Sequence, residues 1–192
     1  MKISILITTV LLSIAATVYA QTPKGIAAST TVELLNANNT LNGIDRPVSL
    51  EDYKNVSGFL LVFTCMTCEH AVAVEDALPA IHRKYAPKGY PVVVVHARSD
   101  DASIYDTMKA HAKAKDFPFA YLYDADNRMA AAYNTTYTPR MVVLKRRNGK
   151  LMVAYAGSID GAAAETIEMA ISNSNLTQKG GLPLQVCSLT QH

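Results

Sequence analysis

The sequence lacks tryptophan, contains only three cysteines and has no long run of charges of one sign. An odd and small number of cysteines excludes a scaffold held together by paired disulfides. Lys and Arg number 18 against 16 Asp and Glu, and the longest basic run is the triplet 145–147. The chain therefore lacks the basic footprint of a nucleic-acid-binding protein, and no nucleic-acid partner is expected.

The overall composition is that of a folded globular protein. Hydrophobic residues make up 49% of the chain and charged residues 18%. This is too apolar and too weakly charged for a disordered chain. Ten Tyr and four Phe supply enough aromatic volume for an ordinary core.

The first twenty residues have the pattern of a cleaved secretory signal peptide. Lys2 precedes the mainly apolar stretch 3–16, and Val18-Tyr19-Ala20 places small residues before a cleavage point at Gln21. The alternative, a membrane anchor, would need an apolar run of about 20 residues. No cysteine lies near the cleavage point to carry a lipid. We therefore expect a periplasmic or secreted protein that does not span a membrane after cleavage.

Export gives the cysteines an oxidising environment, in which thiols are commonly paired. Cys65 and Cys68 are separated by two residues, and Cys187 lies near the C-terminus. A disulfide across so short a loop constrains the unfolded chain very little. The Cys-x-x-Cys pair therefore indicates a chemical function.

A strand, a helix and a second strand surround this pair. The apolar runs 59–63 and 92–95 are short and rich in β-branched or aromatic residues, as buried parallel strands are. Between them, apolar residues spaced three and four apart over 71–85 predict one helix, kinked at Pro79. Residues 59–95 thus predict a βαβ unit.

Weaker patterns predict the other elements. Asn148-Gly149 is a strong hairpin signal between two apolar segments. We expect an edge strand at 28–35, a turn at 36–43, an extended piece at 46–50, helices at 101–116, 126–134 and 160–174, and strands at 119–123, 141–144 and 151–155.

The Cys-x-x-Cys pair stands where the first buried strand gives way to the helix. Free backbone N–H groups and the helix dipole favour an anion at such a point. A thiolate is the attacking form of cysteine, and it would be stabilised there. We expect Cys65 to be the nucleophile, and Cys68, one turn inside the helix, to be the shielded resolving thiol.

Thr138-Pro139 is the second candidate element. It directly precedes the predicted strand at 141–144. An X-Pro bond adopts the cis form far more readily than any other peptide bond. A cis bond would turn the Thr138 backbone outward, where it could pair with an extended substrate chain as an added strand. The plainer alternative is a trans proline that only begins a strand.

Together these segments resemble the thioredoxin superfamily. The runs "LVFTCMTCEHAVAVEDALPAIHRKYAPKGYPVVVVHARSDD" and "FPFAYLYDADNRMAAAYNTTYTPRMVVL" are similar to redoxins of the alkyl hydroperoxide reductase/thiol-specific antioxidant group. The resemblance covers roughly 40–165. It implies an α/β thioredoxin-like fold, with a central mixed β-sheet flanked by helices and an N-terminal β extension. The expected organisation is a signal peptide at 1–20, an N-terminal extension at 21–39, a thioredoxin-like domain at 40–174 and a C-terminal tail at 175–192.

Departures from the family pattern leave the activity open. Thioredoxins carry Trp before the first cysteine and Gly-Pro between the pair, whereas this chain has Thr64 and Met66-Thr67. The intervening residues tune the reduction potential, so the direction of electron flow does not follow. The buried acid of some members is missing from the apolar strand 59–63. Glu69 and His70 are then the nearest possible proton acceptors, unless they simply form a solvated first helical turn.

Peroxidase activity is disfavoured. Peroxiredoxins carry Pro and Thr at set positions upstream of the peroxidatic cysteine. The matching positions hold Gly58 and Val62 if that cysteine is Cys65. They hold Leu61 and Cys65 itself if it is Cys68.

Metal binding is the other alternative. No second Cys-x-x-Cys or Cys/His pair has zinc-finger spacing, so no zinc site is expected. Thiolates favour copper(I), and some copper chaperones have a related fold. Cys65, Cys68 and His70 would then need a further ligand from His96 or His111, although a histidine at the end of a strand is more often an ordinary surface residue.

The sequence therefore predicts an exported thiol–disulfide oxidoreductase without a dissociable cofactor or metal. Its partners would be a protein substrate containing a disulfide or thiols, and a redox partner that resets the cysteine pair. A copper(I)-binding chaperone is the main alternative, followed by a thiol peroxidase.

Overall fold

The computed structural model describes residues 31–97, 99–159, 163–172 and 187–188. The predicted signal peptide at 1–20, most of the extension at 21–39 and nearly all of the tail at 175–192 lie outside these residues. Within the described part, no helix has the length and apolar character needed to cross a membrane.

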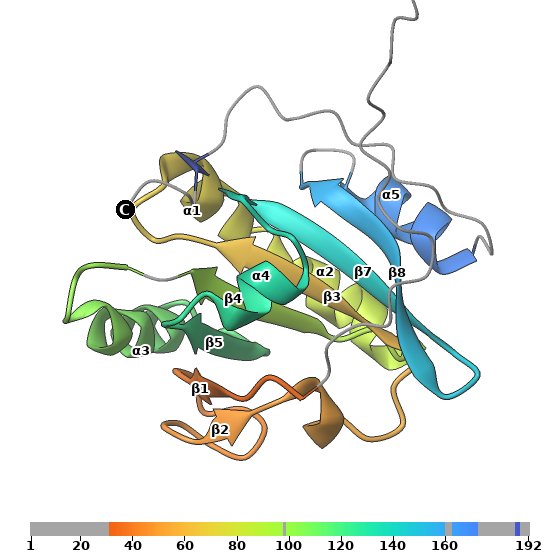
Figure 1. Cartoon of the computed structure of the whole chain (residues 1–192), viewed down its shortest axis with the longest axis horizontal. Helices are drawn as coiled ribbons and strands as arrows, with labels where there is room; N and C mark the ends of the chain where they lie inside the picture. Colours follow the sequence, from red (N-terminus) through yellow and green to blue (C-terminus); the bar gives the residue numbers. More distant parts are fainter. Residues whose placement is uncertain (1–30, 98, 160–162, 173–186, 189–192) are drawn as a thin grey trace, which may run out of the picture.

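A seven-stranded mixed sheet forms the centre of the molecule (Figure 1). The strand order is β2-β1-β5-β4-β3-β7-β8, and β3, β4 and β5 run parallel to one another. The strands are β1 (Leu34–Asn36), β2 (Pro47–Val48), β3 (Gly58–Thr64), β4 (Val92–Ala97), β5 (Ala120–Asp124), β7 (Arg140–Arg147) and β8 (Lys150–Ser158). A separate two-stranded sheet joins β6 (Tyr137–Thr138) to β9 (Cys187–Ser188).

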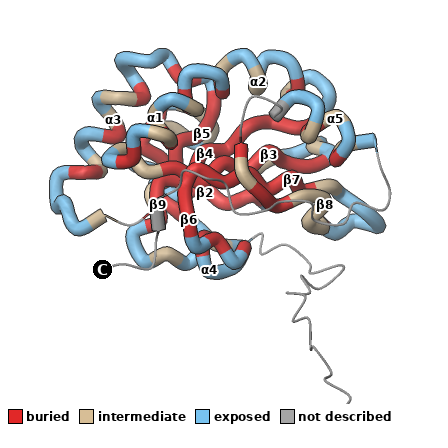
Figure 2. The backbone as a smooth tube through the Cα atoms, turned by 90° about the horizontal axis from the view of Figure 1, so that it is seen from above, coloured by how far each residue is buried: buried red, intermediate tan, exposed pale blue. Residues whose placement is uncertain are grey.

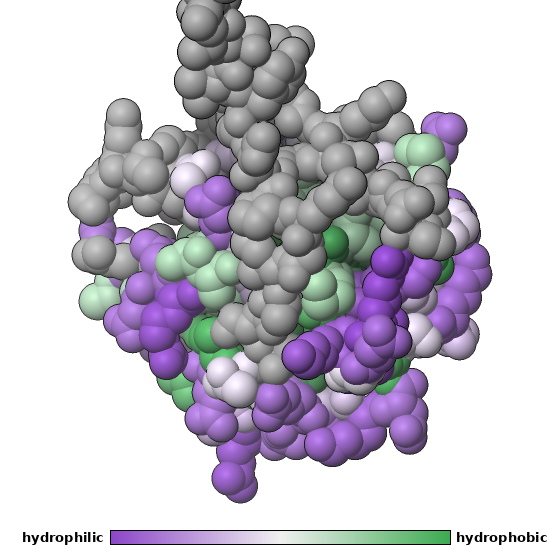
Figure 3. Space-filling model, turned by 45° about the vertical axis from the view of Figure 1, so that its right-hand side comes forward, coloured by the Kyte–Doolittle hydropathy of each residue, from purple (hydrophilic) through white to green (hydrophobic). Residues whose placement is uncertain are grey.

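Helices and short segments cover both faces of the central sheet. Figure 2 shows that the sheet is almost entirely buried, while the helices around it have exposed outer sides. The α-helices are α1 (Glu69–Glu75), α2 (Leu78–Tyr85), α3 (Ile104–Ala114), α4 (Arg128–Ala132) and α5 (Ala163–Ser172), with 3-10 turns at Leu50–Asp52 and Ala86–Lys88. Hydrophilic residues make up most of the described surface visible in Figure 3.

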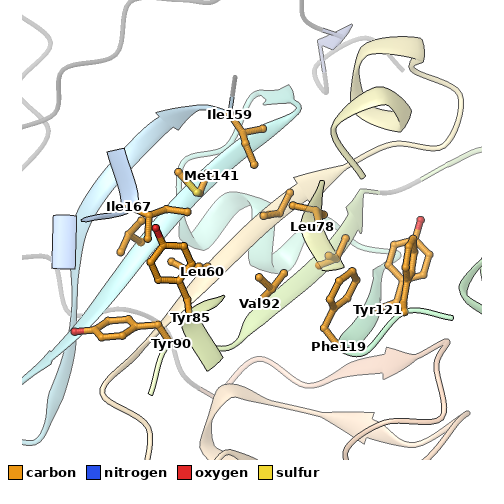
Figure 4. Close-up of a cluster of buried hydrophobic side chains, with 14 of the residues drawn as sticks. Leu60, Leu78, Tyr85, Tyr90, Val92, Phe119, Tyr121, Met141, Ile159 and Ile167 are labelled. Carbon is orange, nitrogen blue, oxygen red and sulfur yellow. The ribbon is translucent and has the colours of Figure 1, made fainter. Parts of the chain in front are cut away.

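The alternation of side chains along each strand separates two apolar clusters. One face of the sheet contributes Leu60 and Val62, which pack with Leu78 of α2, Met108 of α3 and Ile167 of α5 (Figure 4).

The opposite face contributes Phe59, Leu61 and Phe63, which pack with Met129 of α4 and Val48 of β2. β3 is buried along its whole length because it contributes to both clusters. The continuous apolar run at 59–63 is explained by this position, and the predicted α/β thioredoxin-like architecture is confirmed.

Three local predictions need correction. The segment predicted as one kinked helix over 71–85 forms two helices, α1 and α2, and Pro79 lies in the first turn of α2, where its missing N–H needs no partner. The strand predicted at the sheet edge is β1, which lies between β2 and β5, so β2 forms the edge. Helix α3 begins at Ile104, later than predicted, because the Asp101 carboxylate accepts a hydrogen bond from the Ser103 N–H in a turn before it.

The parallel pairing of β3 with β4 and the β7–β8 hairpin are confirmed. Asn148 and Gly149 have φ angles of 50° and 78°, the left-handed conformations that a tight hairpin turn needs.

Two buried asparagines organise the loop between β1 and β2. Asn36 Oδ1 accepts hydrogen bonds from the N–H groups of Asn38 and Tyr121, at 3.1 and 3.2 Å. Asn38 Nδ2 donates to the carbonyls of Phe117 and Phe119, both at 2.8 Å. These amides fasten the loop to β5 and to the segment before it.

Candidate active site

The Cys-x-x-Cys segment forms a turn between β3 and α1. The Cys68 N–H donates to the Cys65 carbonyl at 3.1 Å, which closes the turn. The Cys68 carbonyl then accepts from the N–H groups of Ala71 and Val72. Cys68 is thus the N-cap of α1 and does not lie one turn inside the helix, as the sequence had predicted. Cys65 precedes this N-cap by three residues, and the stabilisation of its thiolate by the helix dipole stays a prediction.

The two cysteines differ in accessibility. Cys65 is a free cysteine of intermediate exposure, whereas Cys68 is disulfide-bonded and 1% exposed. The Cys65 sulfur lies 3.0 Å from Thr67 Oγ1. When Cys65 is ionised, this hydroxyl can only donate, and it then stabilises the thiolate. The sequence analysis did not identify Thr67 as a site residue.

Two buried side chains hold the residues on either side of Cys65. Thr64 Oγ1 donates to Glu75 Oε1 at 3.0 Å, and the Met66 N–H donates to His96 Nε2 at 3.0 Å. The loop that carries the sulfur is therefore fixed at both neighbouring positions.

Glu75 is a buried acid that sequence reasoning missed. It is 1% exposed and lies at the end of α1. Its Oε1 accepts from Thr64 and also from the Tyr121 hydroxyl at 3.3 Å, and its Oε2 lies 2.8 Å from His111 Nε2. Such partners allow a carboxylate to be buried.

Burial raises the pKa of Tyr121, and the negative charge of Glu75 raises it further, so the phenol stays a protonated donor. The charge of Cys65 is a smaller cause of the same rise in the pKa of Tyr121. Strand β3 contains no acidic residue, and the buried acid near the cysteines is Glu75 of helix α1. The signal was the spacing of Ala71, Glu75 and Leu78, which places Glu75 on the buried helix face.

His96 is buried, contrary to the expectation of an ordinary surface residue. Its Nδ1 lies 2.6 Å from the Ala97 carbonyl, which can only accept, so Nδ1 carries the proton and Nε2 accepts from Met66. Burial lowers the pKa of His96, which keeps the ring neutral. Both ring nitrogens are engaged, and neither is available as a copper ligand in this arrangement.

The other metal candidates are not brought together either. Within the residues described here, no group of three or more His, Cys, Asp or Glu side chains could hold a metal ion. His111 is turned to Glu75, and His70 lies in the first turn of α1.

The two predicted proton acceptors lie in the first turn of α1. Glu69 is exposed and His70 is half-buried. Neither has a hydrogen bond or ion pair within the described chain. Both side chains therefore remain candidate proton acceptors.

The Thr138-Pro139 pair lies beside the cysteine loop. Its peptide bond is cis. Strand β7 pairs antiparallel with β3, and Arg140 is opposite Phe63. This is the last paired position of the two strands, and Cys65 and Thr138 each lie two residues beyond it. Thr138 is completely buried, and among the residues that the structure describes its Oγ1 has no hydrogen-bond partner.

Comparison with known proteins gives the family and the fold. The model of the AhpC/TSA family matches residues 30–157. No curated protein matches the chain.

Solved structures with the same fold cover most of the chain. An uncharacterized conserved protein from Geobacillus kaustophilus is 22% identical, with a TM-score of 0.69, over 90% of this chain and 94% of its own. A secreted disulfide oxidoreductase from Mycobacterium tuberculosis, homologous to E. coli DsbE, is 18% identical, with a TM-score of 0.52, over 72% of this chain and 93% of its own.

A thioredoxin-family thiol:disulfide interchange protein from Chlorobium tepidum is 15% identical, with a TM-score of 0.56, over 77% of this chain and 96% of its own. These likenesses show the fold, and the family match covers more than half of the sequence. The chain therefore belongs to the AhpC/TSA family and has a thioredoxin-like fold.

Proposed function

We propose that this protein is an exported thiol–disulfide oxidoreductase in which Cys65 attacks and Cys68 resolves. The observation that carries the proposal is the arrangement of the cysteines: an accessible Cys65 thiol directly follows the buried strand β3, and the buried Cys68 lies one turn away. Accessibility is what an attacking thiol needs, and shielding suits a thiol that reacts only after the first bond has formed.

Fixed neighbours support this assignment. Thr64 is held by Glu75, and the Met66 N–H is held by His96, so the Cys65 backbone is positioned before a substrate arrives. Preorganisation of this kind lowers the entropic cost of reaching the attack geometry. Thr67 adds a donor to the thiolate.

The reaction needs only the two cysteines and the substrate. The Cys65 thiolate attacks one sulfur of a substrate disulfide, the other substrate sulfur leaves as a thiolate, and a mixed disulfide forms. Cys68, once deprotonated, attacks the Cys65 sulfur and expels the second substrate thiolate. Two electrons have then passed to the substrate, and Cys65–Cys68 is oxidised. In the reverse direction the protein donates its disulfide, and a redox partner resets the pair in either case.

Thr138-Pro139 would dock the substrate chain. This role is supported by the position of Thr138 at the end of β7 where Arg140 pairs with Phe63, and by its existing strand pairing with Cys187. An extended substrate segment would bind in the same way, by adding a strand. Glu69 and His70 remain the proposed solvent-side proton acceptors, and the buried Glu75 is a third candidate.

The test is to trap the mixed disulfide. In a Cys68→Ala variant the Cys65-linked intermediate cannot be resolved, so covalent partners should accumulate and disappear on reduction. The matched control, Cys65→Ala, should trap none. Wild-type protein should reduce the insulin disulfides. Insulin reduction by wild type together with no trapping by Cys68→Ala would reject the assigned roles.

The two alternative functions have different signatures. A copper(I) chaperone would bind one equivalent of Cu(I) tightly and lose it when His96 is replaced. A thiol peroxidase would consume hydrogen peroxide with Cys65 or Cys68 as the oxidised residue. Either result, in a protein that does not exchange disulfides, would replace the proposed function.

A further inference from the structure

The docking edge of Thr138 is occupied by the chain's own C-terminal region. Strand β9 pairs antiparallel with β6, with Cys187 opposite Thr138 and Ser188 opposite Tyr137. A segment distant in sequence thus makes the backbone pairing that the proposed function assigns to a substrate.

This pairing places the third cysteine of the chain at the same end of the sheet as the redox loop. The paired register of β3 and β7 ends at Phe63 and Arg140. Cys65 follows Phe63 by two residues, and Thr138, which pairs with Cys187, precedes Arg140 by two residues.

The redox states of the other two cysteines provide an independent observation. Cys68 is disulfide-bonded, whereas Cys65 is a free thiol. The chain has only three cysteines. Since Cys65 is free, Cys187 is the one remaining cysteine in the chain that can serve as the partner of Cys68.

We propose that Cys187 is a third redox-active residue, which forms a disulfide with Cys68. This inference rests on the proposed function for its place in the reaction. After turnover the Cys65–Cys68 bond is present, and the Cys187 thiol loses its proton to solvent. The Cys187 thiolate attacks the Cys68 sulfur, the Cys68–Cys187 bond forms, and Cys65 leaves as a thiolate. One S–S bond replaces another, so no outside oxidant or reductant is needed.

This exchange has a consequence for substrate binding. It returns Cys65 to the free thiol while the two oxidising equivalents stay in the chain. In the same form β9 covers Thr138, so a substrate strand and β9 compete for one edge. Reduction of the Cys68–Cys187 bond is then the step that frees both the resolving thiol and the docking edge.

Disulfide mapping tests the proposal on the full mature chain. The protein is oxidised with limiting diamide, its free thiols are alkylated, and tryptic peptides are analysed without reduction. Cys65 and Cys68 share the tryptic peptide 55–83, and Cys187 lies in 180–192. We expect these two peptides to be cross-linked within a monomer, with the alkyl group on Cys65. Cys65→Ser should keep the cross-link, and its matched control Cys68→Ser should lose it.

Insulin reduction by the same preparations separates the two proposals. If peptide 180–192 carries an alkylated Cys187 while Cys65 and Cys68 are joined, or if the cross-link occurs only in covalent dimers, the role of Cys187 is rejected. Turnover without the cross-link overturns this inference alone. The cross-link without turnover, by contrast, upholds the pairing and overturns the proposed function.

Discussion

Replacing Glu75 by alanine should destabilise the fold strongly, because its carboxylate serves three buried or half-buried partners. Removal leaves the hydroxyls of Thr64 and Tyr121 without an acceptor, and each unsatisfied buried group costs about 1–3 kcal/mol. It also breaks the contact with His111, which is partly solvent-screened because the His111 side chain is 19% exposed. We expect the free energy of unfolding to fall by about 3–5 kcal/mol.

Urea unfolding followed by far-UV circular dichroism, with the cysteines kept reduced, measures this loss. With a urea dependence of about 2 kcal/mol per molar, the midpoint should shift down by about 1.5–2.5 M. Glu75→Gln keeps an acceptor oxygen and should lose about half as much. Glu69→Ala is the matched control, because Glu69 is exposed on the same helix; its midpoint should shift by less than about 0.3 M.

If Glu75→Ala and Glu69→Ala have the same midpoint, the buried hydrogen-bond cluster does not contribute as the geometry requires. A second readout separates stability from positioning. Insulin reduction by folded Glu75→Gln should be slower than by wild type, because Thr64 loses its charged anchor beside the nucleophile. Unchanged rates would show that Glu75 serves the fold alone.

Three further outcomes are expected. Thr67→Val should slow the alkylation of Cys65 by iodoacetamide about three- to tenfold near neutral pH, because the thiolate loses a hydrogen-bond donor. Thr67→Ser keeps the hydroxyl and should react as fast as wild type. Equal rates in all three proteins would contradict the contact between Thr67 and Cys65. Because burial lowers the pKa of His96, the unfolded chain binds this proton first as the pH falls, so stability is full above about pH 6.5 and declines below it. Urea midpoints between pH 5 and 8 should show a smaller decline in His96→Gln, and identical slopes would refute the assignment. Gly58→Ala should destabilise the protein by at least about 2 kcal/mol in thermal unfolding, because a Cβ atom would lie 1.9 Å from a backbone oxygen of β7. If the variant is as stable as wild type, β3 and β7 can move apart to accept the methyl group.

Much of the fold could be predicted because the strongest patterns report on burial. The apolar runs that form β3 and β4 lie at the centre of the sheet, where both faces must be apolar. The division of the helix after β3 was missed because α1 and α2 keep the same apolar spacing across the break. A proline marks a helix interruption well, but here it lies in the first turn of a new helix.

The site could be predicted only in part. The spacing of Cys65 and Cys68 predicts a redox pair. The position of Thr138-Pro139 directly before a strand predicts a substrate-docking element. Glu75, His96 and Thr67 carry no motif, since their roles come from contacts between residues far apart or from the exact turn of a loop. The paired residues of β6 and β9 are separated by 48 and 50 intervening residues, and no local sequence pattern predicts that they meet.

The buried amides of Asn36 and Asn38 have a practical consequence for shortening the protein. A chain that began at residue 40, the start of the domain predicted from the sequence, would lose β1 together with both asparagines. The N–H and carbonyl groups that β5 now shares with them would become an open strand edge, ready to pair with another molecule. Such a shortened protein should aggregate. A shortened chain that is to stay monodisperse must therefore include β1.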